Sequence, residues 1–353
     1  MKKVSRFVLA MTAVFTAAAV TGCSKTGTNS SKSKQGKDLD KISFDWQEVY
    51  KNKIDEFIGS DEYSEDSKFD IIDITDDGSP ELLISPNSQV PTTCYIYKAD
   101  KDGITEVGSA GNCGKFEYLP DIEMLRDEYV GEGFVLGKYI SYTNDSLNNV
   151  VTYSDNSSSA SLGAVIVHEI NGEEVSLPEY NAAVEPYSNA NSISVGRRFS
   201  MGKSAIDYGI KCSESWSLTL DSDRRELCRS LLNDKLQATA GDGTDPAFDL
   251  CDLNGDKCPE LLISDGSNPE ATCTIYYFSG GELVEMEGVY GYAGLVSFDV
   301  ENYVFFSNND GTKTYWSIAN SAFSANNYVE SDSIISIGRK YLVSEDAINS
   351  IFG

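Results

Sequence analysis

Histidine is almost absent from this chain of 353 residues, which contains only His168. Zinc hydrolases hold their metal through several histidines, so a single histidine excludes that class of enzyme. A catalytic triad needs partners close to its histidine, whereas His168 lies in VIVHEI, a segment whose alternating pattern predicts a β-strand. We therefore expect His168 to be a residue of a sheet and not a general base.

Basic residues are scarce as well. The chain has 28 Lys+Arg against 55 Asp+Glu, which gives a formal net charge of -27 at pH 7. Nucleic acids are bound through Lys and Arg, so this composition excludes them as partners. The same composition favours the binding of cations. With 41% hydrophobic residues, the chain can still bury a large core.

Long apolar runs are limited to one, residues 7–20, which follow three basic residues and are short for a membrane-spanning helix. The run ends in VTGC at residues 20–23. Together these features resemble the signal peptide and lipobox of bacterial surface lipoproteins. The resemblance implies cleavage before Cys23 and attachment of acyl chains such as palmitate to its thiol. An ordinary secretory signal with a chance cysteine is the alternative.

The first 44 residues therefore have a targeting role. We interpret residues 1–22 as a lipoprotein signal peptide and residues 23–44, which are rich in Ser, Lys and Gly, as a flexible tether. The expected location is the extracellular face of the cell membrane, where the lipid on Cys23 would be the link to the membrane.

Beyond the tether, the chain repeats itself. KFDIIDITDDGSPELLIS, which begins at Lys68, matches AFDLCDLNGDKCPELLIS, which begins at Ala247, at an offset of 179 residues. A later pair, ISVGRRFSMGKSAID and ISIGRKYLVSEDAIN, matches at an offset of 142. Two copies of this length predict tandem domains and not a solenoid. We assign residues 45–212 to repeat unit 1 and residues 213–353 to repeat unit 2.

Each repeat unit has the pattern of a helix followed by strands. Apolar residues at helical spacing predict helices over residues 45–59 and 223–237. Apolar alternation broken by Asp-Gly, Gly-Gly and Asn-Gly predicts β-hairpins, and SEDAINSIF predicts a closing helix capped at Ser344. The fold class we expect is α+β: two tandem duplicated units, each a mainly antiparallel β-sheet with an N-terminal helix and a short C-terminal helix.

Both copies contain an acidic loop with oxygen donors at alternate positions. Ca²⁺ takes about six to eight oxygen ligands, which such a loop can supply together with water. The frame resembles the D-x-[DN]-x-D-G-x-x-[DE] calcium loops of FG-GAP repeats and the first nine positions of the EF-hand loop, but position 12 is Ile and not Glu. The resemblance implies one Ca²⁺ in each unit. The implied ligands are Asp73, Thr75, Asp77, Ser79 and Glu81 in the first loop and Asp252, Asn254, Asp256, Cys258 and Glu260 in the second.

A solvated turn is the alternative, because Asp, Asn, Gly and Pro form turns without a metal. Gly78 stands at position 6 of the first loop, where a sharp turn needs positive φ, but Lys257 stands there in the second. We expect a cation bound at either loop to stabilise the fold and not to act in catalysis.

Two further patterns carry weaker signals. Ser200 and Lys203 have the S-x-x-K spacing of penicillin-binding proteins, but the motifs that support it are missing. Arg197 and Arg339 each follow a glycine, and we expect each to pair with an acid of its own unit.

The function we expect is that of a membrane-anchored extracellular binding or interaction module without catalytic residues, whose partner is a glycan or a protein. The alternative is a hydrolase that cleaves glycan or peptide through acidic residues. A binding module should present an exposed aromatic or polar patch, whereas a hydrolase should have a deep cleft with two facing carboxylates.

Overall fold

The computed structural model describes residues 45–353, apart from residues 76, 88–92, 112–114, 132, 158–165, 189, 213–218, 242, 289, 310–311 and 319–327. Residues 44–353 form one compact unit. The signal peptide, the tether and Cys23 lie outside the described residues. None of the helices described is both long enough and apolar enough to cross a membrane.

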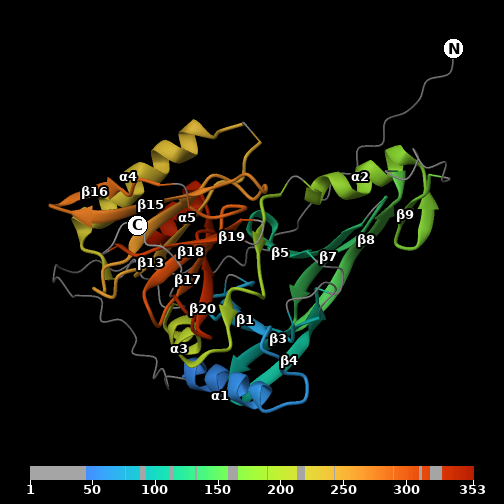
Figure 1. Cartoon of the computed structure of the whole chain (residues 1–353). Helices are drawn as coiled ribbons and strands as arrows, with labels where there is room; N and C mark the ends of the chain where they lie inside the picture. Colours follow the sequence, from blue (N-terminus) through green and yellow to red (C-terminus); the bar gives the residue numbers. More distant parts are fainter. Residues whose placement is uncertain are drawn as a thin grey trace, which may run out of the picture. The chain divides into compact units, whose positions relative to one another are not determined.

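The described strands form three sheets, and every pairing between them is antiparallel (Figure 1). Five α-helices accompany these sheets in the described part of the chain, so the predicted α+β class is confirmed. The helices are α1 (Trp46–Ile58), α2 (Leu177–Ser188), α3 (Lys203–Cys212), α4 (Ser222–Ala238) and α5 (Glu345–Phe352), with a 3-10 turn at Pro120–Ile122.

The first sheet has nine strands and contains segments from both halves of the chain. In order, they are β19 (Thr312–Trp316), β18 (Val304–Asn309), β17 (Val296–Asp299), β20 (Ile334–Ile337), β12 (Phe199–Ser200), β1 (Lys68–Ile72), β2 (Glu81–Ser85), β3 (Cys94–Asp100) and β4 (Gly103–Ala110). The two halves meet where β12 pairs with β20, at Phe199 and Ile335.

The other two sheets each draw on one half of the chain. The second is β10 (Glu173–Val175), β9 (His168–Ile170), β8 (Ser146–Asp155), β7 (Phe134–Thr143), β6 (Met124–Gly131), β5 (Lys115–Leu119) and β11 (Ile193–Ser194). The third is β16 (Glu282–Glu285), β15 (Cys273–Ser279), β14 (Glu260–Ser264), β13 (Ala247–Cys251) and β21 (Tyr341–Leu342).

The helix ends follow the sequence signals. The Asp45 side chain caps α1 by accepting from the N–H groups of Gln47 and Glu48, and Ser344 caps α5 as predicted. The predicted helices over residues 45–59 and 223–237 are confirmed as α1 and α4. The β9–β10 and β15–β16 hairpins turn at the predicted Asn-Gly and Gly-Gly pairs. The β3–β4 hairpin turns at Lys101-Asp102, one residue before the predicted Asp-Gly pair, because Gly103 already pairs with Asp100.

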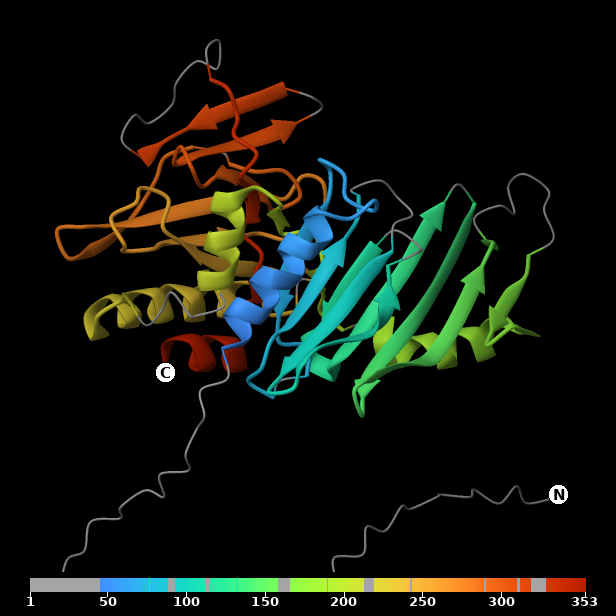
Figure 2. The same ribbon diagram turned by 90° about the horizontal axis from the view of Figure 1, so that it is seen from below.

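Strand β2, with the sequence ELLIS, is buried on both faces. Leu82 and Ile84 pack into the core that contains α1 and α3, while Leu83 packs with residues of β5, β6 and β7 of the second sheet. Figure 2 shows α1, in blue, and the green strands of the second sheet on opposite sides of the blue-to-cyan strands of the first half. Strand β14 has the same sequence and is buried in the same way, with Leu262 in the first core and Leu261 against α4 and α5. Each acidic loop therefore leads into a fully buried strand.

Candidate cation loops

Each acidic loop connects two antiparallel strands. The first loop joins β1 to β2, where Ile72 pairs with Glu81, and the second joins β13 to β14, where Cys251 pairs with Glu260. The residues after position 9 are strand, so the loops have the predicted strand–loop–strand form and not the loop–helix form of an EF-hand.

The carboxylate at position 1 closes each loop upon its own backbone. Asp73 Oδ2 accepts from the Gly78 N–H at 2.8 Å, and Asp252 Oδ2 accepts from the Lys257 N–H at 3.0 Å. Gly78 has φ +83°, as position 6 requires, and Lys257 adopts φ +68° at the same position. A side chain in this conformation costs about 1–2 kcal/mol, so the second loop maintains its turn against strain.

The glutamates at position 9 are buried. Glu81 is 0% exposed and Glu260 is 3% exposed. One oxygen of each accepts from a loop N–H, Ile74 at 3.0 Å and Leu253 at 2.7 Å. Burial, assisted by neighbouring aspartates, raises the pKa of Glu81 to about 7 and the pKa of Glu260 to about 8.

In the second loop, the side chains at positions 3, 5 and 9 converge. Asn254 Nδ2 donates to Asp256 Oδ2 at 3.2 Å and to Glu260 Oε1 at 3.0 Å. An amide nitrogen thus lies between the two carboxylates. The orientation of this amide is determined by its partners, because Asn254 Oδ1 accepts from the Asp256 N–H at 2.8 Å.

In the first loop, position 3 is too short to do the same. Thr75 Oγ1 lies 3.4 Å from Asp73 Oδ1. Glu81 Oε1 is buried and has no hydrogen-bond partner. Lys98 Nζ supplies positive charge nearby, 3.4 Å from Asp77 Oδ2. The two loops therefore have matching hydrogen bonds from backbone N–H groups to the carboxylates at positions 1 and 9. They differ in the side chains that contact their carboxylates.

Position 7 enters both loops through its backbone. The Ser79 N–H donates to Asp77 Oδ1 at 2.8 Å, and the Cys258 N–H donates to Asp256 Oδ1 at 2.7 Å. The Cys258 thiol points elsewhere and contacts Arg224 Nη1 at 3.3 Å. Within the part of the chain that the structure describes, no group of three or more His, Cys, Asp and Glu could hold a metal ion as they stand. Calcium at either loop thus stays a prediction.

A buried pair of aspartates behind the loops was missed by the sequence reasoning. Asp70 Oδ2 accepts from the Gly196 N–H at 3.0 Å, and Asp249 Oδ2 accepts from the Gly338 N–H at 3.1 Å. Burial raises the pKa of Asp70. Asp249 is 0% exposed and forms an ion pair with Arg198 Nη2 at 2.6 Å. The available signal was that both halves repeat the same two segments, FDI or FDL followed later by IS-x-G.

Of the two arginines expected to pair with acids, one does. Arg339 Nη2 lies 2.8 Å from Asp245 Oδ2, and Nη1 donates to Ser264 Oγ, so the prediction is confirmed for this residue with a partner outside the loop. Arg197 is half-buried beside the Cys94 thiol, and no ion pair to a described acid accompanies it. The adjacent Arg198 instead forms an ion pair, with Asp249 of the other repeat unit.

The two weak catalytic motifs have structural positions. His168 lies in β9, buried, with Nδ1 3.1 Å from Asp155 Oδ1, so its prediction as a sheet residue is confirmed.

Ser200 Oγ donates to the Asp332 carbonyl at 2.6 Å and accepts from the Ile334 N–H at 2.9 Å. Its hydroxyl therefore joins β12 to the neighbouring β20 segment, while the Lys203 side chain is exposed.

An apolar patch lies on one face of the second sheet. Tyr129 pairs with Leu136 across β6 and β7, and Phe134 is two residues along, so all three share a face. Phe134 and Leu136 are 43% and 45% exposed, and the Tyr129 and Phe134 rings are 5.4 Å apart. Helix α2 covers the opposite face, where Tyr139 stacks on Tyr187. We call Tyr129, Phe134 and Leu136 the open-face patch.

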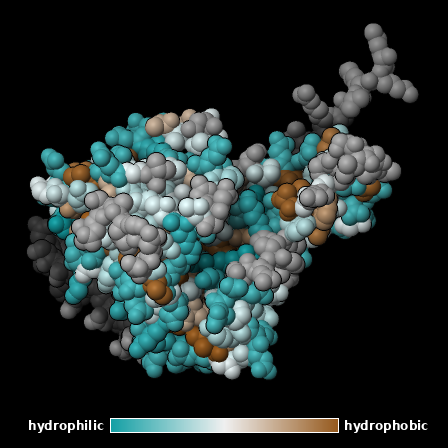
Figure 3. Space-filling view, viewed as in Figure 1, coloured by the Kyte–Doolittle hydropathy of each residue, from teal (hydrophilic) through white to brown (hydrophobic). Residues whose placement is uncertain are grey.

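The rest of the visible surface is mainly hydrophilic. Figure 3 shows apolar residues in small separate groups, with no continuous apolar area on the face that it draws. Small apolar groups are normal on a soluble surface. An aromatic pair with an aliphatic neighbour on one face of a sheet is a more specific feature.

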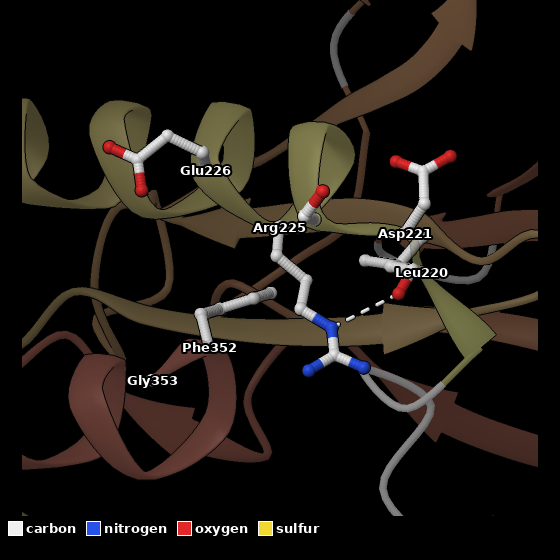
Figure 4. A pocket seen from close by; sticks show the side chains of 7 residues that line it. Leu220, Asp221, Arg225, Glu226, Phe352 and Gly353 are labelled. Atoms are coloured by element: carbon white, nitrogen blue, oxygen red, sulfur yellow. Dashed lines mark hydrogen bonds between the residues drawn. The ribbon is translucent and has the colours of Figure 1, made fainter.

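One hollow of about 460 Å³ lies between the start of α4 and the end of α5. Arg225 Nε donates to the Leu220 carbonyl there at 3.0 Å. Figure 4 shows the carboxylates of Asp221 and Glu226 pointing in different directions, so this hollow does not present the facing acids of a glycoside hydrolase.

No family model, no curated protein and no solved structure matches this chain. Its class is therefore defined by the α+β fold and the two acidic strand–loop–strand connections.

Proposed function

We propose that this protein is a lipid-anchored extracellular binding module without catalytic residues, in which each acidic loop holds a structural Ca²⁺. The observation that carries the binding role is the open-face patch, where Phe134 and Leu136 are exposed beside the half-buried ring of Tyr129, on a sheet whose other face is covered by α2. A protein partner suits this patch better than a glycan does, because the aliphatic Leu136 lies directly across from Tyr129. Aromatic and aliphatic residues together are typical of protein interfaces.

Site-directed crosslinking in the cell tests the binding role. A photo-crosslinking amino acid at position 136 should yield an adduct with a partner protein, and Phe134→Ser should reduce its yield about tenfold by removing an aromatic anchor. The same amino acid at Val329, which is 82% exposed, is the matched control and should yield none. An adduct at both positions, or at neither, contradicts the role of the patch in protein binding. Cosedimentation of residues 44–353 with cell-wall polysaccharide would instead indicate a glycan partner.

Calcium at the loops is supported by the buried glutamates. Three carboxylates close together repel one another, and burial adds to the cost of their charge. A divalent cation offsets both effects. In the second loop, the side chains at positions 3, 5 and 9 converge, and a cation held between Asp256 and Glu260 would take the place of the Asn254 amide nitrogen. We assign the ion a structural role because each loop leads into a buried strand.

The lipid anchor rests on the sequence of residues 1–23. Cys23→Ser should abolish incorporation of labelled palmitate and move the protein from the membrane fraction to the soluble fraction, because the thiol is the acylated atom. Palmitate labelling with membrane fractionation checks this result. Cys258→Ser is the control and should keep both the label and the membrane fraction. Undiminished label in the Cys23→Ser variant would overturn the anchor.

We infer that residues 45–212 and 213–353 arose by duplication. The series α1-β1-β2-β3-β4 and α4-β13-β14-β15-β16 have the same order. The paired contacts of Asp70 with Gly196 and of Asp249 with Gly338 support the same inference. The halves are interlocked rather than separate, because β12 and β20 belong to one sheet.

A further inference from the structure

The first acidic loop has neighbours from distant parts of the chain. Lys98, on β3, places Nζ 3.4 Å from Asp77 Oδ2 and 3.1 Å from Asp145 Oδ1. Asp145 lies in the turn between β7 and β8, far from the loop in sequence. At the position in β15 that matches Lys98, the second half has Tyr277. The ammonium group thus bridges a loop carboxylate and a carboxylate that no loop motif includes.

A buried acceptor without a partner lies in the same place. Glu81 Oε1 is buried and has no hydrogen bond, and neither does the buried Tyr142 Oη of β7. Glu81 and Tyr142 interact electrostatically, and so do Glu81 and Asp77. Buried polar atoms are usually satisfied by protein, water or an ion. In the second loop the corresponding oxygen, Glu260 Oε1, receives the Asn254 amide.

We propose that Asp145 is a ligand of the divalent cation at the first loop, and that Lys98 takes the place of that cation when no metal is bound. The proposal rests on the proposed calcium role of the loops. A hard cation with oxygen ligands suits carboxylates from three elements: Asp77 of the loop, Glu81 of β2 and Asp145 of the β7–β8 turn. Lys98 is 27% exposed, so its side chain can leave toward solvent as the ion enters.

The β7–β8 turn holds Asp145 in position. Asn144 and Asp145 have φ +53° and +54°, the left-handed pair that a tight hairpin turn requires. A cation bound by Asp145 therefore ties this hairpin to the first loop. Strand β7 also carries Leu136 of the open-face patch near its N-terminal end. An ion bound by Asp145 therefore restrains the C-terminal end of the same strand.

Calcium titration of residues 44–353 by calorimetry tests the proposal. Asp145→Asn keeps the turn, because Asn tolerates left-handed backbone, and should weaken one of two calcium sites about tenfold through the loss of a charged ligand. Lys98→Met should tighten that same site. Asp252→Asn should remove the other site. Asp102→Asn is the matched control, an exposed aspartate of the β3–β4 turn, and should change neither site.

The outcomes separate the two proposals. If Asp145→Asn leaves both affinities unchanged while Asp252→Asn removes one site, Asp145 is not a ligand and the calcium role of the loops stands. If the unaltered protein binds no calcium, both proposals are wrong. Amide exchange gives an independent readout: calcium should slow exchange at the β7–β8 turn in the unaltered protein and leave it unchanged in Asp145→Asn.

Discussion

Calcium at about a hundredfold above its dissociation constant is expected to raise the melting temperature of residues 44–353 by about 5–10 °C. Each of the two ions, if it binds only the folded state, then adds about 2.7 kcal/mol. At an unfolding entropy of about 2.1 cal/mol/K per residue, a unit of this size gains about 1.5 °C for each kcal/mol. The loops are the expected source, since Glu81 and Glu260 are carboxylates buried beside other carboxylates. Differential scanning calorimetry with and without calcium measures the shift.

The double variant Asp73→Ala with Asp252→Ala should eliminate this shift, because both position-1 carboxylates are lost. Asp61→Ala with Asp102→Ala removes the same charge from exposed positions outside the loops and should retain it. A shift that persists in the loop variant would mean that calcium binds elsewhere.

The calcium effect should also depend on pH. Without metal, the raised pKa of Glu260, about 8, means that the folded state holds a proton that the unfolded state releases near its ordinary value of 4.5. That contribution to stability is present below pH 4.5 and is lost as the pH rises to 8. Calcium must displace this proton at pH 6 but not above pH 8. The shift in melting temperature should therefore be larger at the higher pH.

Arg198→Met is expected to lower the free energy of unfolding by about 3–5 kcal/mol, the usual effect of breaking a buried ion pair from one side. Arg198 Nη2 lies 2.6 Å from Asp249 Oδ2, and Asp249 is 0% exposed. Without the guanidinium, a buried carboxylate keeps its N–H donors but loses its cation. Urea unfolding followed by tryptophan fluorescence measures the change.

Arg198→Met with Asp249→Asn should recover more than half of that loss, since the neutral amide leaves no uncompensated charge. Arg229→Met is the control: its ion pair with Glu226 is exposed, and such pairs contribute about 0–1 kcal/mol. Equal losses in Arg198→Met and Arg229→Met would show that the buried pair does not stabilise the fold.

Local features of the fold could be predicted from the sequence. Asp45 and Ser344 cap helices, and the Asn-Gly and Gly-Gly pairs turn hairpins, because each signal acts over a few residues. Helix α2 was missed even though Ser176 and Glu179 have the spacing of a capping box, and the Ser176 N–H and hydroxyl both donate to Glu179 Oε2. Pro186 lies inside this helix, and because proline usually breaks a helix interior, the sequence did not indicate a helix there.

Long-range pairing could not be predicted. Strands β12 and β20 are short, and nothing in Phe199 or Ile335 selects one partner strand over another. Within the loops, the sequence predicted the strand–loop–strand form and the position of Gly78. It could not place Lys98 or Asp145 beside Asp77, because that contact depends on how the second sheet packs on the first.

Equilibrium dialysis of residues 44–353 against radioactive calcium counts the bound ions most directly. Two ions per chain are expected, reduced to one by Asp252→Ala and to none when Asp73→Ala is added. No bound ion at millimolar calcium would contradict the calcium role and leave both loops as metal-free turns.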